Sequence, residues 1–282
     1  MNRLSMDKKV AVISALVEGC SVRATSRLTG VAKGTILRLL AEVGTACAEY
    51  QNVTLRNIPA RRIQIDEIWS FCYAKQRNVT PTMFDDGGFA GDVWTFVAID
   101  ADSKLALSWL VGRRDAGFAT DFLQDVAGRL KNRVQLTTDG HKMYLTAVPD
   151  AFGESIDYAQ LVKVYGNDAE GQKRYSPAQC LGTTRQIVIG DPHPAHVSTS
   201  FVERQNLTMR MQMRRFTRLT NAFSKKLENH CHAVALFYMW YNFARVHHTL
   251  RVSPAMEAGI SQSVWSVQDI ITLSASAGKM AA

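Results

Sequence analysis

The sequence predicts a mixed α/β protein. A five-stranded mixed sheet flanked by helices is expected between three short N-terminal helices and a helical C-terminal extension. Segments rich in β-branched and aromatic residues alternate with polar turns, which is the pattern of strands. Three of them follow one another closely and predict an antiparallel meander, while helical periodicity separates the others. The strands are expected at 61–74, 92–100, 104–112, 133–138 and 160–165, and the intervening helices at 119–130 and 141–151.

The first 50 residues carry the pattern of a helix-turn-helix DNA-binding domain. Apolar stripes predict helices at 6–17, 22–28 and 32–42. Gly30 suits the tight turn before the third helix, from which Lys33, Thr35 and Arg38 point outward. That layout is typical of a helix presented to the major groove. A helical hairpin used for dimerisation is the alternative, and the outward basic residues favour DNA binding.

Charge is unevenly distributed along the 282 residues, whose formal net charge is +8. Residues 1–60 hold eight basic and four acidic side chains, residues 200–251 hold nine and two, and residues 61–199 hold 15 and 17. A slightly acidic centre between basic neighbours suits a carboxylate-bearing catalytic core beside surfaces that bind a polyanion. The chain has no apolar run of membrane-spanning length and no signal peptide, and its five cysteines show no paired spacing. We therefore expect a cytoplasmic protein with reduced thiols and no membrane partner.

Three acidic residues stand where folding can bring them into one site. Asp66 lies in the middle of the first strand, where a carboxylate is costly unless it is paired or bound to a cation. Asp139 ends the fourth strand, and Glu203 lies near the start of a helix. Carboxylate ligands without histidine or cysteine favour Mg²⁺ or Mn²⁺, and two such ions can activate an attacking oxygen and stabilise a leaving oxygen of a phosphodiester. Glu67 and Asp100, also strand acids, are expected to lie outside this site.

The helix that is expected to begin near Ser200 has an acidic residue near its start and basic residues further along. Ser200 and Glu203 have the spacing of a capping box, so a capping glutamate on an ordinary solvated helix is the alternative interpretation. Polar and basic residues follow Glu203 at helical spacing, and a site of this kind must also contact phosphate. The further DNA-binding candidates are Arg204, Asn206, Arg210, Arg214, Arg215, Lys225 and Lys226.

Several of these segments resemble the DDE transposases of the insertion sequence 1 family, within the ribonuclease H-like integrase superfamily. The resemblance covers about residues 62–254. It rests on Ile65-Asp-Glu-Ile-Trp69, Thr137-Thr-Asp-Gly140 and, above all, Val202-Glu-Arg-Gln-Asn-Leu-Thr-Met-Arg210. Phe223-Ser-Lys-Lys226 and Tyr241-Asn-Phe-Ala-Arg-Val-His247 also look like the stretches that follow the catalytic glutamate in such enzymes. The order and spacing of the pieces together are specific.

The resemblance implies a ribonuclease H-like core in which Asp66, Asp139 and Glu203 form a catalytic triad that binds two Mg²⁺ or Mn²⁺ ions. It implies DNA nicking at the ends of a mobile element and strand transfer into target DNA. The expected partners are double-stranded DNA, in the form of terminal inverted repeats and target DNA, and further copies of the chain. The expected location is the nucleoid of a bacterial cell. The cysteine-bearing zinc element of this family is missing here, so end recognition is expected to rest on residues 1–50.

These features predict four parts of the chain. They are a helix-turn-helix domain (1–50), a linker (51–61), a catalytic core (62–215) and a basic helical extension with a tail (216–282). One long helix is expected at 223–245, a loop at 166–198 and a frayed tail past Ser266.

Two other functions remain open from the sequence. One is a helix-turn-helix regulator whose core only maintains the fold. The other is a stand-alone ribonuclease H-like nuclease. The presence of Asp66, Asp139 and Glu203 argues against the regulator, and the N-terminal helix-turn-helix segment argues against the stand-alone nuclease.

Overall fold

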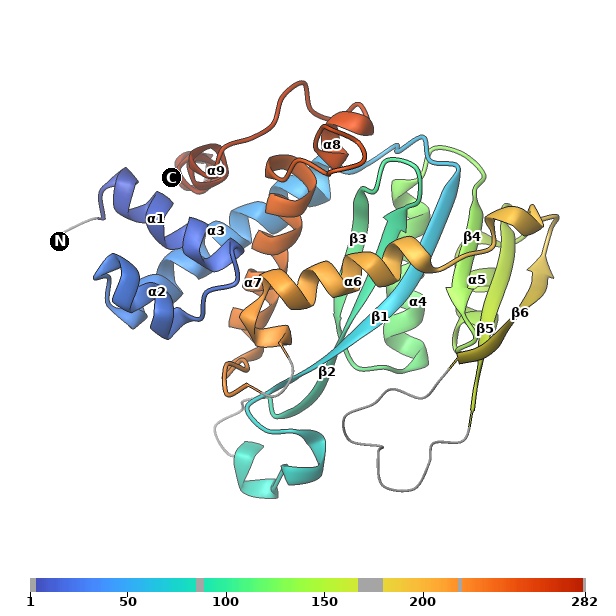
Figure 1. Ribbon diagram of the computed structural model, residues 1–282, viewed down its shortest axis with the longest axis horizontal. Coiled ribbons are helices and arrows are strands. Elements are labelled where there is room, and N and C mark those ends of the chain that lie inside the picture. The colour runs from blue at the N-terminus through green and yellow to red at the C-terminus, as the bar shows by residue number, and fades with distance from the viewer. Residues whose placement is uncertain (1–3, 85–88, 167–179, 218–219, 281–282) are drawn as a thin grey trace.

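The computed structural model describes residues 4–84, 89–166, 180–217 and 220–280, and one six-stranded sheet forms its centre (Figure 1). The strands are β1 (Arg62–Cys72), β2 (Gly91–Asp100), β3 (Ala106–Gly112), β4 (Gln135–Asp139), β5 (Asp157–Tyr165) and β6 (Cys180–Ile189). They lie side by side in the order β3-β2-β1-β4-β5-β6. The first three form an antiparallel meander, β4 and β5 run parallel to β1, and β6 is antiparallel to β5.

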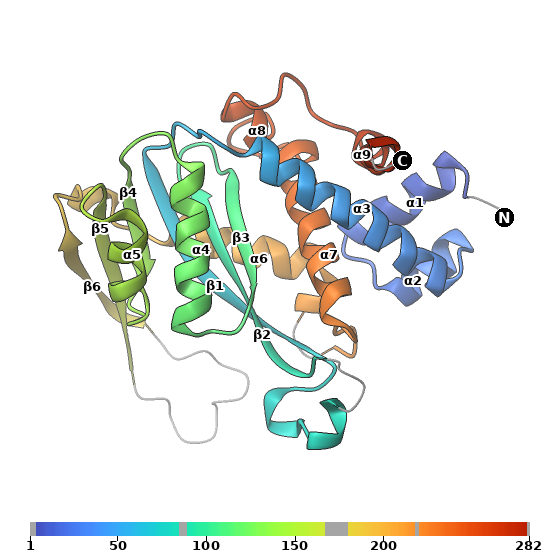
Figure 2. The same ribbon diagram turned by 180° about the vertical axis from the view of Figure 1, so that it is seen from behind.

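Helices cover both faces of this sheet. α4 (Ala116–Arg129) and α5 (Tyr144–Phe152) lie on one face, and α6 (Ser200–Gln212) crosses the other (Figure 1 and Figure 2). The apolar stripe of α4 is buried against the sheet. The predicted order of three strands, helix, strand, helix and strand is therefore confirmed.

The turn between β2 and β3 shows why these two strands pair so closely. The Asp100 carboxylate accepts hydrogen bonds from the backbone N–H groups of Asp102 and Ser103 at 3.2 and 3.1 Å. Lys104 follows with a φ of 62°, a left-handed conformation that closes the turn. Asp100 is thus a turn residue, as expected of an acid outside the candidate site.

A helical bundle lies beside the β3 edge of the sheet (Figure 1). It contains α1 (Met6–Val17), α2 (Val22–Thr29), α3 (Lys33–Thr54), α7 (Leu227–Met239), α8 (Pro254–Glu257) and α9 (Val267–Met280). α3 packs along α7, and a π-helical turn at Trp240–Ala244 follows α7. Four short 3-10 turns complete the described elements, at Gln76–Asn78, Pro81–Phe84, Pro194–His196 and Arg214–Phe216.

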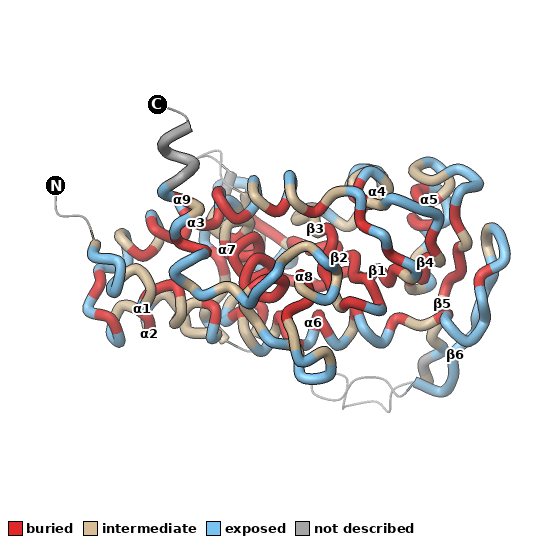
Figure 3. The backbone as a smooth tube through the Cα atoms, turned by 90° about the horizontal axis from the view of Figure 1, so that it is seen from above, coloured by how far each residue is buried: buried red, intermediate tan, exposed pale blue. Residues whose placement is uncertain are grey.

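One continuous apolar core joins the bundle to the sheet (Figure 3). Asn242 in the π-helical turn accepts a hydrogen bond from the backbone N–H of Ala106 and donates one to its carbonyl, at 3.0 and 2.9 Å. It thereby satisfies backbone groups at the edge of β3. Trp109 of β3 stacks on Tyr238 of α7, with ring centroids 4.8 Å apart. The bundle is therefore bonded to the sheet as well as packed on it.

Four expectations from the sequence are wrong. The sheet has six strands, because β6 lies within the segment expected to be a loop. α3 runs on to Thr54, past the end expected for the third helix and into the predicted linker. The helix expected at 223–245 begins at Leu227 and changes to a π-helical turn at Trp240. The tail past Ser266 forms α9, whose Ile270 and Ile271 are buried in the core.

Within the described ranges, no helix is long and apolar enough to cross a membrane.

Gly44 permits the close approach of α3 and α7. A Cβ at this position would lie 2.6 Å from both the Cβ and the carbonyl oxygen of His232, so the backbone of one helix would have to move. We therefore expect Gly44→Ala to lower the free energy of unfolding by about 1–3 kcal/mol, the usual cost of overpacking. Thermal and urea melts would measure it.

Gly34 in the same helix provides the matched control. A Cβ there meets no heavy atom within 4 Å, and alanine is the better helix former. Gly34→Ala should therefore melt at the same temperature as the wild type or above it. If both variants melted alike, the close packing of α3 on α7 would be contradicted.

Candidate active site

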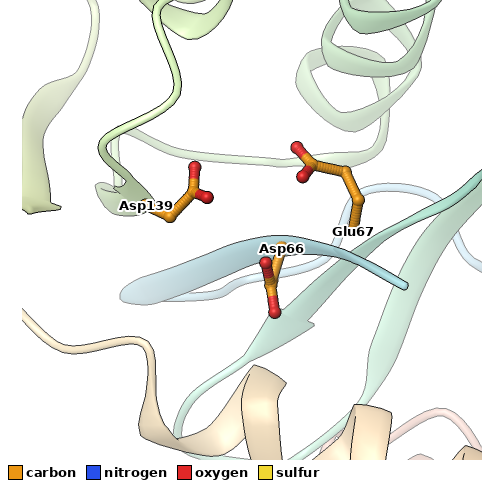
Figure 4. Close-up of side chains that lie close together, drawn as sticks. All are labelled: Asp66, Glu67 and Asp139. Atoms are coloured by element: carbon orange, nitrogen blue, oxygen red, sulfur yellow. The ribbon is translucent and has the colours of Figure 1, made fainter. Parts of the chain in front are cut away.

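Two adjacent carboxylates lie in the central strand β1. Asp66 and Glu67 leave the strand on opposite sides, because successive side chains of a strand alternate (Figure 4). Asp139 reaches toward them from the end of β4, the parallel neighbour of β1. One carboxylate oxygen from each of the three residues lies within 4.8 Å of the others. In the described part of the chain, this is the one group of at least three acidic, histidine or cysteine side chains close enough to share an ion.

The face of β1 that carries Asp66 is bonded to α6. The Nδ2 of Asn206 donates to Oδ2 of Asp66 at 2.9 Å. Two residues before Asp66, the side-chain oxygen of Gln64 accepts hydrogen bonds from the backbone N–H groups of Phe201 and Val202 at 2.8 and 3.2 Å. These N–H groups have no partner within the helix. Gln64 and Asp66 therefore fix the position of α6 on the sheet.

Asp66 carries an incompletely balanced charge. Its pKa is raised to about 7, mainly by burial and in addition by the negative charges of Glu67, Asp139 and Glu203. Beside it, the Oδ1 of Asn206 is buried and has no hydrogen-bond partner in the described structure. A buried oxygen without a partner next to clustered carboxylates is the donor set that a hard divalent cation takes. The residues present therefore fit Mg²⁺ or Mn²⁺.

The expectation that Glu67 lies outside the site is wrong. Its buried carboxylate accepts two hydrogen bonds from Arg114, at 3.2 and 3.0 Å, and one from the hydroxyl of Tyr144. Burial raises the pKa of Glu67, while Tyr144 and Arg114 oppose that rise. The same guanidinium lies 3.8 Å from Oδ2 of Asp139 and 4.5 Å from the ring centroid of Trp94. Glu67 thus holds Arg114 in place beside Asp139.

Glu203 lies on α6 outside this group of three carboxylates. Its carboxylate pairs with the ammonium of Lys163 on β5 and accepts a hydrogen bond from the hydroxyl of Thr199. Its charge contributes to the raised pKa of Asp66, so the two groups interact electrostatically. Ser200 is the first residue of the helix and Thr199 precedes it as the cap, so Ser200 and Glu203 do not form the capping box of the alternative interpretation.

The predicted DNA-binding residues occupy different environments. Lys33, Arg38, Arg204, Arg214, Lys225 and Lys226 are exposed, whereas Thr35, Arg210 and Arg215 are half-buried. Asn206 is buried, and its amide nitrogen bonds Asp66. Its contacts are therefore those of a residue that positions a carboxylate.

Four side chains of this site had no role in the sequence interpretation. They are Gln64, Arg114, Tyr144 and Lys163. Gln64 has a signal in the sequence, because a polar residue two positions before Asp66 shares its face of the strand. The other three reach the site from β5, α5 and the residues between β3 and α4, so only the folded chain reveals them.

Comparisons with known proteins give weak likenesses. No protein-family model and no curated protein matches the sequence. Among solved structures, two chains are similar to about half of this one: the "Mos1 Strand Transfer Complex" (14% identity, TM-score 0.22, 53% of this chain and 55% of that chain) and the "Mos1 transposase paired-end complex with left transposon end" (14%, 0.23, 54% and 56%). This chain spans about half the length of either. A "piggyBac transposase synaptic complex with hairpin DNA" is similar at 11% identity and a TM-score of 0.38, over 100% of this chain and 74% of that chain. Likenesses at these scores assign neither fold nor function here.

The raised pKa of Asp66 predicts a pH dependence of stability. A carboxyl whose pKa is higher in the folded than in the unfolded state stabilises the fold at low pH, and this contribution is lost as the pH rises from about 4 to about 7. In EDTA, Asp66→Asn should therefore gain melting temperature relative to the wild type between pH 5 and pH 8.

Asp121→Asn, an exposed change on α4, is the control and should follow the wild type at every pH. Added Mn²⁺ should raise the melting temperature of the wild type at pH 8 more than that of Asp66→Asn. A difference in melting temperature between Asp66→Asn and the wild type that stayed constant from pH 5 to pH 8 would contradict the unbalanced charge of Asp66.

Proposed function

We propose that this chain is a DDE transposase, with the ribonuclease H-like core and the insertion sequence 1 type of motif described above. The observation that carries the proposal is the placement of Asp66 and Asp139 on neighbouring parallel strands, with carboxylate oxygens within 4.8 Å of each other. In addition, α6 is bonded to the face of β1 that carries Asp66. The resemblance of the three motif segments in their order along the chain supports it further.

In this proposal Asp66, Asp139 and Glu203 hold two Mg²⁺ or Mn²⁺ ions. Bound metal supplies charge stabilisation to the attacking and leaving oxygens of an in-line displacement at phosphorus. Asn206 orients the Asp66 carboxylate through its amide nitrogen and offers its buried Oδ1 to the same region. Lys163 holds the Glu203 carboxylate on the α6 side of the sheet.

Glu67 and Arg114 act on the other side of β1 as positioning residues. Arg114 is held by two hydrogen bonds to the side chain of Glu67 and lies 3.8 Å from Asp139. In this arrangement it restrains the Asp139 carboxylate and offsets part of the negative charge of the cluster.

The first three helices serve as the DNA-reading domain in this proposal. Gly30 ends α2 in the left-handed conformation, with a φ of 70°, and α3 begins three residues later. Lys33 and Arg38 are exposed near the start of α3, where a helix in the major groove places its reading residues. Because two element ends must be joined in one reaction, we infer that several copies of the chain assemble on DNA.

Removing a negative ligand should abolish the chemistry. Asp66→Asn, Asp139→Asn and Glu203→Gln keep side-chain size, and each is expected to reduce nicking and joining by roughly 10²–10³-fold or more, as losing a principal charge-stabilising group does. The measurement is cleavage and strand transfer of labelled DNA carrying the sequences that flank the gene, in Mg²⁺ and in Mn²⁺. DNA binding in gel shifts should persist, because α3 belongs to the helical bundle whereas the acids lie on β1, β4 and α6.

Asp121→Asn is again the matched acid-to-amide control, because Asp121 is exposed on α4 and lies outside the acidic group. Glu67→Gln should show an intermediate loss, because glutamine retains a partner for Tyr144 but weakens the hold on Arg114. Normal cutting by Glu203→Gln would remove this residue from the triad. Cleavage without joining would favour a stand-alone nuclease, and no metal-dependent cleavage at all would favour a regulator.

End recognition should depend on the exposed cations of α3. Lys33→Ala and Arg38→Ala are expected to reduce the preference for end DNA over random DNA in gel-shift competition by about 1–3 kcal/mol each if they contact base edges. Lys131→Ala, which removes an exposed cation near the start of β4, is the control. Unchanged preference in both α3 variants would contradict the reading role of this helix.

A further inference from the structure

A cavity of about 850 Å³ lies between the N-terminal helices and the segment that follows α6. Its walls come from the α1–α2 turn and the start of α3 on one side, and from residues 213–215, residues 220–225 and α7 on the other. This volume falls in the range of pockets that enclose a small ligand. It suits one extended strand of a polymer and is too small for a duplex.

The lining of this cavity contains both cationic and apolar side chains. Six basic side chains line it: Arg23, Arg27, Lys33, Arg214, Arg215 and Lys225. Among the described residues of the lining, none is acidic. Leu16, Leu37 and Phe223, also in the lining, are apolar and only partly buried, so part of their surface is accessible. A lining that combines cations with accessible apolar side chains is complementary to a ligand that carries both phosphates and flat apolar rings.

Arg215 is held in place without an anionic partner. Its Nη1 donates to the Ser224 hydroxyl at 3.1 Å and to the Asn229 carbonyl at 2.7 Å. No carboxylate in the described structure forms an ion pair with it. Burial lowers its pKa to about 10, as expected of a guanidinium whose charge is not balanced. An anion in the cavity would supply the missing partner.

The cavity has packed walls. Gly19 in the α1–α2 turn has a φ of 85°, and a Cβ there would lie 3.0 Å from the carbonyl oxygen of Met211 in α6. The N-terminal helices therefore touch the end of α6 directly. On the opposite wall, the ammonium of Lys225 lies 4.2 Å from the ring centroid of Phe223, whose ring packs at a tilt on Phe71 of β1. Both walls are anchored to neighbouring elements.

We propose that this cavity binds a short stretch of single-stranded DNA, with its phosphates against the six cations and its bases against the accessible apolar side chains. The proposal rests on the proposed function, which supplies DNA as the ligand. Single-strand sites combine these two features, because unpaired bases offer apolar faces that a duplex keeps stacked. Duplex DNA at α3 and a single strand in the cavity are thus neighbouring contacts of the same chain, and Lys33, which lines the cavity at the start of α3, belongs to both.

Fluorescence anisotropy with a labelled oligothymidylate of about six nucleotides, in EDTA, tests this site. Arg23→Ala/Arg27→Ala removes two exposed lining cations that make no described side-chain contact, so the fold should be retained. Binding should weaken, and the slope of log affinity against log salt should become shallower by about 0.7 for each phosphate that the variant no longer neutralises. Lys131→Ala should bind like the wild type. Equal binding and equal slopes for wild type and double variant would overturn the proposal.

Cys20 gives a second readout because it lines the cavity, whereas Cys180 is exposed on β6 outside it. Saturating oligothymidylate should slow maleimide labelling of Cys20, measured by mass spectrometry, and leave that of Cys180 unchanged. A blunt duplex should protect neither cysteine. Protection of Cys20 by duplex as strong as that by the single strand would overturn the assignment to single-stranded DNA.

The cavity and the acidic cluster can be tested separately. Asp66→Asn should bind the oligonucleotide as the wild type does, because Asp66 is not part of the lining. A wild-type protein that binds the strand but never cleaves DNA would overturn only the transposase proposal. A protein that cleaves and joins DNA but does not bind the strand would overturn only the cavity proposal.

Discussion

Two carboxylates in succession within a central strand impose the constraint on which this arrangement depends. Because side chains alternate along a strand, Asp66 and Glu67 cannot share one set of partners. Glu67 is satisfied within the protein by Arg114 and Tyr144. Asp66 receives a neutral amide from Asn206, and its raised pKa reflects the deficit of positive charge on that side. Glu67 on one face of β1 is therefore neutralised within the protein, whereas Asp66 on the other face is suited to a cation.

The rest of the sheet brings further groups to this strand. Parallel pairing with β1 directs the end of β4 to the same edge, which places Asp139 within reach of both neighbouring acids. Gln64 caps α6 from β1 itself, so the helix that carries Glu203 and Asn206 is set by the strand that carries Asp66. The spacing of the acids thus follows from backbone pairing and one helix cap, and requires no unusual backbone conformation at the acids.

The sequence is informative wherever burial imposes a pattern. The apolar stripes of α1–α4, the first five strands and the positions of Asp66 and Asp139 follow from such patterns. β6 is not predicted because eight of its ten residues are exposed, so burial imposes no alternation of apolar residues there. Backbone pairing to β5 places the strand instead. α3 continues past residue 42, the end expected for the third helix, and its Gln51 is buried against α7, where it donates to the carbonyl of Ala235. The position of Glu67 in the cluster could not be predicted for another reason, because it depends on Arg114 and Tyr144, which lie far away in sequence.

The junction between bundle and sheet limits how α3, the proposed DNA-reading helix, can move relative to the acids. Gln51 of α3 accepts a hydrogen bond from Asn242, and Asn242 bonds the edge strand β3, so α3 and the sheet are parts of one core. In the proposed function, α3 therefore does not swing toward the acids. α6 connects the two regions instead, because Glu203 and Asn206 lie on it and Arg214, which follows its end at Gln212, lines the cavity. The helix from Arg204 to Gln212 is about 12 Å long, a distance that a strand separated from its partner can follow.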